Sequence, residues 1–337
     1  MSSVVIEAIA YELAPRRISS AELENELAET MDRLRLQRGH LERLTGIRER
    51  GFWNPGTLPS TGATAAARRV LEMADIDPAD IGALINTSVC KDYYEPSVAC
   101  LVHGNLGLNT ACLNYDIGNA CVGFLNGMDV VSMMIEKGLI RRALVVDCEA
   151  PEEGIEATIA RLRGPDIDRK TFLEHYATLT LGSGAVAMVL SHVDHARQGH
   201  LINGSVSRAA TEHNGLCLAQ RDHMVVDGHT LMMAGIELAG MTWKVAEREL
   251  PNWSETTLNH YIPHQVSVRH TGYFAEALGL TREKFFLNVQ HQGNIGPAAV
   301  PITLGMAADS GRLQSGDHVA LIGVGSGVNC TLMSVTW

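Results

Sequence analysis

The hydrophobic and polar positions of the chain alternate between short apolar runs and longer amphipathic stretches. Apolar runs of strand length predict strands at 3–12, 81–87, 113–117, 143–147, 181–190, 201–208, 258–262, 285–289, 318–323 and 328–335. Apolar residues at spacings of three and four predict helices at 20–44, 60–74, 97–106, 121–133, 230–250, 266–278 and 297–310. Nearly continuous apolar strands such as 81–87 are typical of a parallel sheet covered on both faces. The pattern therefore predicts an α/β protein.

The two parts of the chain repeat the same order of elements without repeating their sequence. In each part a strand is followed by a Gly-Asn pair and a helix, at Gly118-Asn119 in the first and Gly293-Asn294 in the second. This order predicts a duplicated α/β unit with one site where the halves meet. We place the halves at 1–195 and 196–337. Residues 149–180 lack clear periodicity, and we interpret them as an insertion that forms a cap or part of a dimer interface.

Composition narrows the class of protein. With 337 residues, 46% hydrophobic and 19% charged, the chain is large enough for two domains or two fused halves. The net charge is −11 and no long basic cluster occurs, which argues against nucleic-acid binding. The first apolar run precedes the arginines, the reverse of a secretory signal, and no stretch has the length of a membrane span, so we expect a cytoplasmic protein. Seven cysteines at irregular spacings, without a Cys-x-x-Cys pair, predict neither a disulfide framework nor a metal site.

Cys121 is the strongest candidate nucleophile. It lies where the strand pattern of Leu113, Tyr115 and Ile117 stops and a helical pattern begins. A thiol at a helix N-terminus lies near the positive end of the helix dipole, and this setting lowers its pKa. The alternative is an inert cysteine of the core, since free cysteine is among the most buried residue types.

Polar residues elsewhere are candidates for the same site. The polar and aromatic loop 88–96 and His264 each follow a strand, at the sheet edge where α/β proteins bind ligands. Asn294 follows Gly293, and glycines near 325 permit close approach of a backbone to a ligand. The ordinary alternatives are a structural role for His264, a turn or cap role for Asn294, and a simple glycine-rich turn near 325, which is not followed by the helix that phosphate binding requires.

Taken together, four motifs resemble the thiolase superfamily, specifically its β-ketoacyl synthase III branch. They are Asn-Ala-Cys-x-Gly-Phe around Cys121, Pro-His-Gln around His264, Gly-Asn-x-x-x-Ala-x-Val-Pro from Gly293, and the terminal Gly-x-Gly-Ser-Gly; Thr45-Gly-Ile-Arg-Glu-Arg50 also matches. The resemblance implies a thiolase fold, in which duplicated βαβαβ halves form a five-layered αβαβα sandwich. It also implies a catalytic triad of Cys121, His264 and Asn294, with the backbone N–H groups of Cys121 and Gly327 as an oxyanion hole.

Within that branch, further stretches resemble the OleA type of bacterial olefin synthesis. They are 86–97, 210–217, 293–301 and 325–330. The resemblance implies head-to-head condensation of two fatty acyl-CoA molecules to a 2-alkyl-3-keto acid, in a homodimer, with CoA thioesters as substrates and no cofactor. It gives Glu95 the role of removing an α-proton in the partner's site, because no decarboxylation supplies the carbanion. Without the resemblance, Glu95 is typical of a solvated loop carboxylate.

The chain departs from the branch at the CoA clamp. Malonyl-using synthases hold the adenine with a tryptophan and an arginine, and this sequence has His40 and Leu44 there. Arg269 matches a basic position near the CoA or carrier phosphates, with a surface arginine on a helix as the alternative. Two other functions stay open: a malonyl-dependent β-ketoacyl synthase III, and a non-enzymatic subunit that donates Glu95 to another chain. Downstream enzymes of the same pathway are further expected partners.

Overall fold

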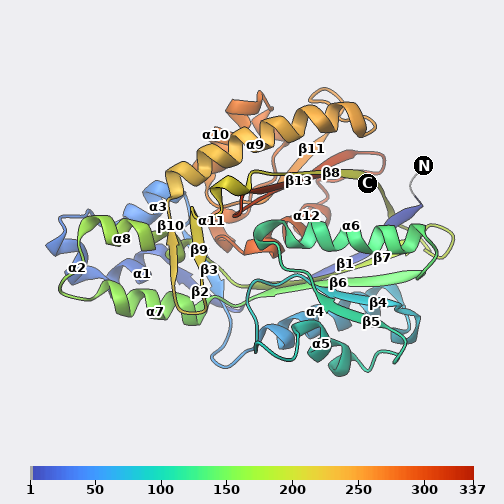
Figure 1. The fold of residues 1–337 in the computed structure, drawn as a ribbon, viewed down its shortest axis with the longest axis horizontal. Helices are drawn as coiled ribbons and strands as arrows, with labels where there is room; N and C mark the ends of the chain where they lie inside the picture. The colour runs from blue at the N-terminus through green and yellow to red at the C-terminus, as the bar shows by residue number, and fades with distance from the viewer. Residues whose placement is uncertain (1–2) are drawn as a thin grey trace.

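The computed structural model describes residues 3–337, which form alternating layers of helix and sheet (Figure 1). The strands are β1 Val4–Leu13, β2 Arg16–Ser19, β3 Glu49–Phe52, β4 Ala83–Asn86, β5 Leu113–Asp116, β6 Arg142–Glu149, β7 Gly184–His192, β8 His200–Ala209, β9 Cys217–Ala219, β10 Met224–Val226, β11 His260–Pro263, β12 His318–Gly325 and β13 Asn329–Thr336. The helices are α1 Ser20–Glu26, α2 Ala28–Arg33, α3 His40–Thr45, α4 Pro59–Ala74, α5 Val98–Leu106, α6 Gly123–Glu136, α7 Glu152–Leu162, α8 Arg169–Tyr176, α9 Gly228–Glu249, α10 Val268–Leu278, α11 Val289–Gln292 and α12 Ala299–Asp309. Short 3₁₀ turns are labelled η.

The layers follow the order expected of a thiolase fold. Figure 1 shows α9 and α10 over the strands β11, β13 and β8, then α6 and α12 in the middle, then the strands β1, β7, β6, β4 and β5, and α4 and α5 below. Strands β6 and β7 are buried along almost their whole length because helices cover both of their faces. The duplicated α/β architecture predicted from the sequence is therefore confirmed.

The main sheet has nine strands in the order β11-β12-β13-β8-β1-β7-β6-β4-β5. Its two halves are joined by a short pairing of β1 with β8, at Val5 with Leu201 and Ile6 with His200. Moving outward from this seam, β1, β7, β6 and β4 in one half correspond in order to β8, β13, β12 and β11 in the other. Strand β5 has no full counterpart and forms a free edge of the sheet.

The predicted strand at 285–289 is wrong. Only Phe285 forms a parallel bridge, to Tyr261, and α11 begins at Val289. The reason is a buried side chain that replaces the strand ladder: the Gln265 Oε1 accepts hydrogen bonds from the backbone N–H of Asn288 at 3.0 Å and of Val289 at 3.2 Å. These donors are therefore not available to a neighbouring strand.

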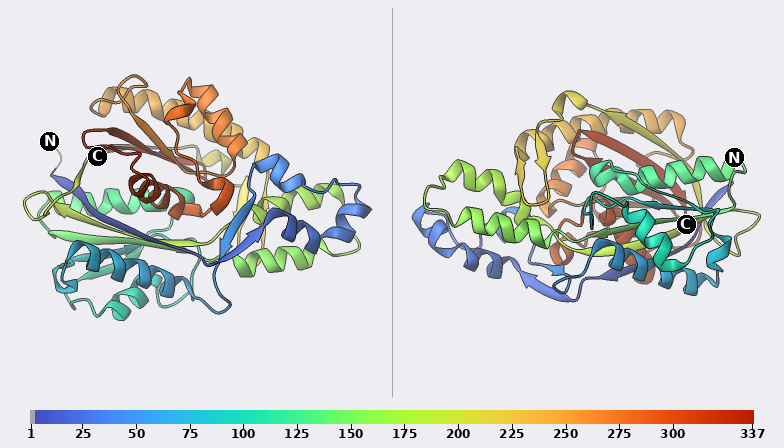
Figure 2. Two further views of the ribbon diagram at one scale, coloured as in Figure 1. Left: turned by 180° about the vertical axis from the view of Figure 1, so that it is seen from behind. Right: turned by 60° about the horizontal axis from the view of Figure 1, so that its bottom comes forward.

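Residues 149–180, whose periodicity is unclear in the sequence, form the helices α7 and α8. Ile155, Ile159 and Leu162 recur at helical spacing and are buried. They pack with residues of α1 to α3, into which the predicted helix 20–44 divides, in a separate hydrophobic cluster. Figure 2 shows these helices as a lobe at one end of the molecule.

The described residues have three further features. Within residues 3–337, no helix combines the length and the apolar character needed to cross a membrane. In the same range, no group of three or more histidine, cysteine, aspartate or glutamate side chains is arranged to hold a metal ion. All seven cysteines are free thiols.

Candidate active site

The two central helices begin at the same place, one from each half of the chain. Helix α6 is preceded by η2 (Ala120–Val122) and α12 by η6 (Gly296–Ala298), and these two turns pack against each other. The carboxyl end of β12 packs on η2, and β6 packs on η6. Cys121 lies in η2, Asn294 lies two residues before η6, and the ring of His264 makes a hydrogen bond with the Gly296 backbone. The structure thus brings Cys121, His264 and Asn294 to the point where the halves meet.

Cys121 is held in a tight turn and remains partly exposed. Ala120 before it has a φ of +44°, and a side chain at Gly325 would place its Cβ 3.1 Å from the Cys121 nitrogen. A larger residue at 325 would therefore push the Cys121 turn away by a few tenths of an ångström. The expectation of a lowered thiol pKa is wrong: burial, followed by Cys217, Glu149 and Asp147, raises the pKa of Cys121 to about 12. The candidate nucleophile is therefore a neutral thiol at neutral pH.

His264 supplies a neutral imidazole at the same junction of the two halves. It directly follows β11, and its backbone N–H donates to the Ile322 carbonyl at 2.7 Å. Burial, with a smaller effect of His270, lowers the pKa of His264 to about 3. Its Nδ1 is buried and has no hydrogen-bond partner among the described residues. An unprotonated ring at neutral pH is able to accept a proton.

Asn294 is fixed by its backbone and by its own side chain. Its N–H donates to the Thr180 carbonyl at 2.8 Å, and its carbonyl accepts from the Gly182 N–H at 2.9 Å. The side-chain Oδ1 accepts the Gly296 N–H at 3.0 Å. This bond orients the carboxamide so that its NH₂ group, which has no acceptor in the described part of the chain, is left to donate to a ligand.

Gly327 lies in the turn between β12 and β13, with a φ of +131°. The turn is tied to the nucleophile's own segment, since the Asn329 Nδ2 donates to the Asn119 Oδ1 at 3.0 Å. A Cβ at Gly327 would lie 2.5 Å from that same Nδ2. The position therefore requires glycine, while the role of its N–H as an oxyanion donor stays a prediction.

Glu95 lies on the loop between β4 and α5, where it is exposed and makes no hydrogen bond or ion pair within residues 3–337. The loop is firmly anchored elsewhere. Buried Asp92 accepts hydrogen bonds from the Ser60 N–H at 2.9 Å and from its hydroxyl. Next to Glu95, Tyr94 is 95% exposed. The loop thus presents Glu95 outward, away from the contacts of its own chain.

Two buried acids near Cys121 escaped the sequence analysis. Asp147 accepts the Thr87 hydroxyl at 2.5 Å, and Glu149 accepts the N–H of Val89 at 2.7 Å and of Cys90 at 3.3 Å. Burial raises the pKa of both carboxyls, to about 7 for Glu149, and each acid also acts on the other. The signal that could have found them is in the sequence: the apolar run 143–147 ends in an acid, and a second acid follows two residues later.

Arg269 lies apart from this cluster. It is an exposed residue in the first turn of α10, and no ion pair or hydrogen bond holds it in the described chain. Its neighbour Val268 lines a surface pocket together with Gly39, Glu42, Arg43, Gly46, Arg48 and Gln290. The motif that includes Thr45 and Arg48 thus lies beside the start of α10.

Comparisons with known proteins show which proteins the chain is similar to. Two family models match the chain: 3-oxoacyl-[acyl-carrier-protein] synthase III over residues 115–206 and the C-terminal part of that synthase over 249–337. An acyl-CoA:acyl-CoA alkyltransferase of Xanthomonas campestris is 41% identical over 335 residues, covering 99% of both chains. A protein of the same name from Shewanella oneidensis is 37% identical, covering 100% of this chain and 99% of its own length.

A solved structure extends the likeness to the whole fold. It is a cysteine-to-serine variant of Xanthomonas campestris OleA with bound lauric acid and lauroyl-CoA. Its TM-score with this chain is 0.97 at 40% identity, and the match covers 99% of each chain.

Proposed function

This chain belongs to the OleA-type acyl-CoA:acyl-CoA alkyltransferases, in the β-ketoacyl synthase III branch of the thiolase superfamily, and we propose that it joins two fatty acyl-CoA molecules head to head without decarboxylation. The observation that carries the proposal is the convergence of Cys121, His264 and Asn294 at the junction of the two halves. The exposed Glu95, on a loop anchored on both sides, supplies the additional base that such a reaction needs.

The first step transfers one acyl chain to the enzyme. The thiol of Cys121 gives its proton to the neutral imidazole of His264, and the sulfur attacks the thioester carbonyl of the first acyl-CoA. The C–S bond to CoA breaks, and the CoA thiolate takes up the proton. Covalent capture divides one difficult reaction into two easier steps. The backbone N–H groups of Cys121 and Gly327 hold the oxyanion.

The second step forms the carbon–carbon bond. Asn294 and His264 donate hydrogen bonds to the thioester oxygen of the second acyl-CoA, and this polarisation acidifies its α-carbon. Glu95 removes the α-proton, and the resulting enolate attacks the acyl carbonyl on Cys121. The Cys121 thiolate then leaves and recovers the proton that Glu95 removed, giving a 2-alkyl-3-ketoacyl-CoA. Attack of water on this thioester releases CoA and the 2-alkyl-3-keto acid. No cofactor enters either step.

Glu95 acts in a homodimer, in the site of a second copy of the chain. Strand β5 is a free sheet edge that carries exposed Leu113 and Tyr115, and exposed Tyr94 lies on the Glu95 loop. A free edge with apolar side chains invites pairing with another strand. Pairing there buries this surface and carries each loop toward the other copy.

The CoA nucleotide docks at the start of α10. Arg269, with Arg43 and Arg48 of the adjacent pocket, offers guanidinium groups to the CoA phosphates. These groups take the place of the tryptophan–arginine clamp, which this chain lacks because it has His40 and Leu44 at those positions. We also propose that the protein acts in the cytoplasm and that downstream enzymes of the same pathway are its partners.

The test uses the purified protein and a single long-chain acyl-CoA, with no malonyl donor. We expect mass spectrometry to detect the β-keto acid or the ketone formed by its decarboxylation, and to detect neither with Cys121→Ala. Glu95→Ala should still acylate Cys121 and release one equivalent of CoA but lose condensation. An acyl enzyme that turns over only after malonyl-carrier protein is added would contradict the proposal, as would full condensation by Glu95→Ala.

A further inference from the structure

The loop that carries Glu95 begins on a buried carboxylate of its own chain. Glu149, at the end of β6, accepts the Val89 N–H at 2.7 Å and the Cys90 N–H at 3.3 Å. The Cys90 thiol also makes a hydrogen bond with this carboxylate. Three donors at the start of one loop thus converge on the side chain of Glu149, which is 5% exposed.

The same carboxylate lies against the turn that holds Asn294. A side chain at Gly296 would place its Cβ 3.4 Å from the carboxyl carbon of Glu149, and the Gly296 N–H is the group that orients Asn294. Glu149 therefore fills the space between the base of the Glu95 loop and the nucleophile's own site. No basic side chain pairs with it among residues 3–337, so the carboxylate accepts mainly from the two backbone N–H groups and the thiol at the start of the loop.

We propose that Glu149 is a positioning residue, which fixes the start of the 88–96 loop so that Glu95 reaches the reaction centre of a second copy of this chain. The inference rests on the proposed function of Glu95. The loop has further anchors at Asp92 and Asp116, which receive donors from Ser60 and from the first residues of α5. Removing Glu149 therefore shifts the loop without unfolding it.

Glu149→Gln is the substitution that isolates this role. The amide keeps the size of the side chain but replaces one acceptor oxygen with a donor, which then faces the N–H of Val89 or Cys90. Misplacement of a reacting group by about 1 Å costs roughly 10²-fold in rate, so we expect condensation to fall about 10- to 100-fold. Glu152→Gln is the matched control, because Glu152 bonds to Trp53 and Ser183 and not to the loop.

Mixed dimers show whether the substitution acts on the chain that carries the working Cys121 or on the partner chain. Each dimer pairs one chain with intact Cys121 and one chain with Cys121→Ala, so that it has a single working site. Glu149→Gln is put either on the Cys121→Ala chain, which supplies Glu95 to the working site, or on the intact chain. Glu95→Ala is placed in the same two ways as a reference. The CoA released by the first acylation counts the folded working sites.

We expect Glu149→Gln to slow condensation only on the Cys121→Ala chain, with the same placement dependence as Glu95→Ala and an unchanged CoA burst. A loss confined to the intact chain, or equal on both chains, would overturn the inference, because Glu149 would then act at its own nucleophile or on the fold. If Glu95→Ala itself has no effect in either placement, the proposed role of Glu95 fails, and with it the inference. The reference dimers separate these two failures.

Discussion

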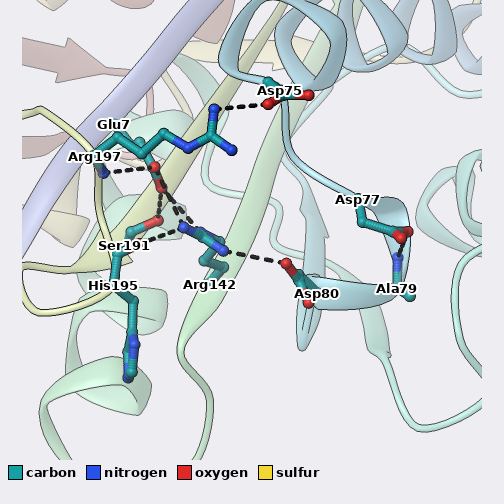
Figure 3. A network of polar contacts seen from close by, with 9 residues as sticks. All are labelled: Glu7, Asp75, Asp77, Ala79, Asp80, Arg142, Ser191, His195 and Arg197. Carbon is teal, nitrogen blue, oxygen red and sulfur yellow. Dashed lines mark hydrogen bonds and ion pairs between the residues drawn. The ribbon is translucent and has the colours of Figure 1, made fainter.

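The two ends of strand β6 carry buried charge in opposite ways. At its beginning, the Arg142 Nε donates to the buried Glu7 at 3.0 Å, and the Ser191 hydroxyl and the Arg197 N–H bind the same carboxylate (Figure 3). At its end, Asp147 and Glu149 lie side by side with no cation, and the Asp147 Oδ1 has no partner among the described residues. At the first end Arg142 neutralises the buried Glu7, whereas at the other end Asp147 and Glu149 lie together near Cys121 without a cation.

This difference separates a structural role from a functional one. A buried carboxylate with a cation and hydrogen-bond donors keeps its charge at little cost, whereas burial without a cation raises the pKa of Asp147 and of Glu149. Strongly perturbed acids next to a nucleophile are typical of active sites. We therefore assign a structural role to the Arg142 end of the strand and a functional role to the end that carries Asp147 and Glu149.

The largest expected effect is at the paired end. Arg142→Met would leave Glu7 buried with its charge uncompensated, and we expect the free energy of unfolding to fall by about 3 kcal/mol or more. Arg197→Met is the control, since its guanidinium pairs only with exposed Asp75 and should cost less than about 1 kcal/mol. Chemical denaturation at neutral pH measures both, and equal losses would show that the Glu7 pair has no special role.

A smaller effect is expected at the unpaired end, as a dependence of stability on pH. The pKa of Glu149 is about 7 in the folded protein and near 4.5 in the unfolded chain. Between these values the folded state binds more protons, so stability falls as pH rises, by on the order of 3 kcal/mol for this group. Glu149→Gln cannot titrate, and its stability should change less over the same range.

Denaturation of both proteins at pH 5, 6, 7 and 8 checks this prediction. The stability of Glu149→Gln relative to the wild type should increase from pH 5 to pH 7. A constant difference between the two proteins would mean that Glu149 is already ionised at pH 5 and is compensated in the same way as Glu7.

Much of the architecture was predictable because periodicity depends on local burial. All nine strands of the main sheet followed from apolar runs. The motifs also placed Cys121, His264 and Asn294 at the ends of elements, and the structure brings these ends to one junction. The strand at 285–289 failed because Gln265, distant in sequence, captures two N–H groups there. Such a competing acceptor leaves no trace in local hydrophobicity.

The electrostatics of the site were less predictable than its residues. A cysteine at a helix N-terminus indicates a lowered pKa, but the structure surrounds Cys121 with protein and places Asp147 and Glu149 near it. These acids lie about 26 to 28 positions away in sequence, and only the sheet brings them close. The sign of a pKa shift therefore depends on tertiary neighbours that a single segment does not reveal.

The central claim is that the Arg142 end of β6 serves folding and the Glu149 end serves the reaction. The most direct test is the condensation rate per folded molecule of Arg142→Met and Glu149→Gln, measured side by side on one long-chain acyl-CoA at a temperature where both are folded. We predict that Arg142→Met stays within about twofold of the wild type, since it alters no contact of the site. Glu149→Gln should lose roughly 10- to 100-fold. Similar losses in both variants, or a loss confined to Arg142→Met, would contradict the account.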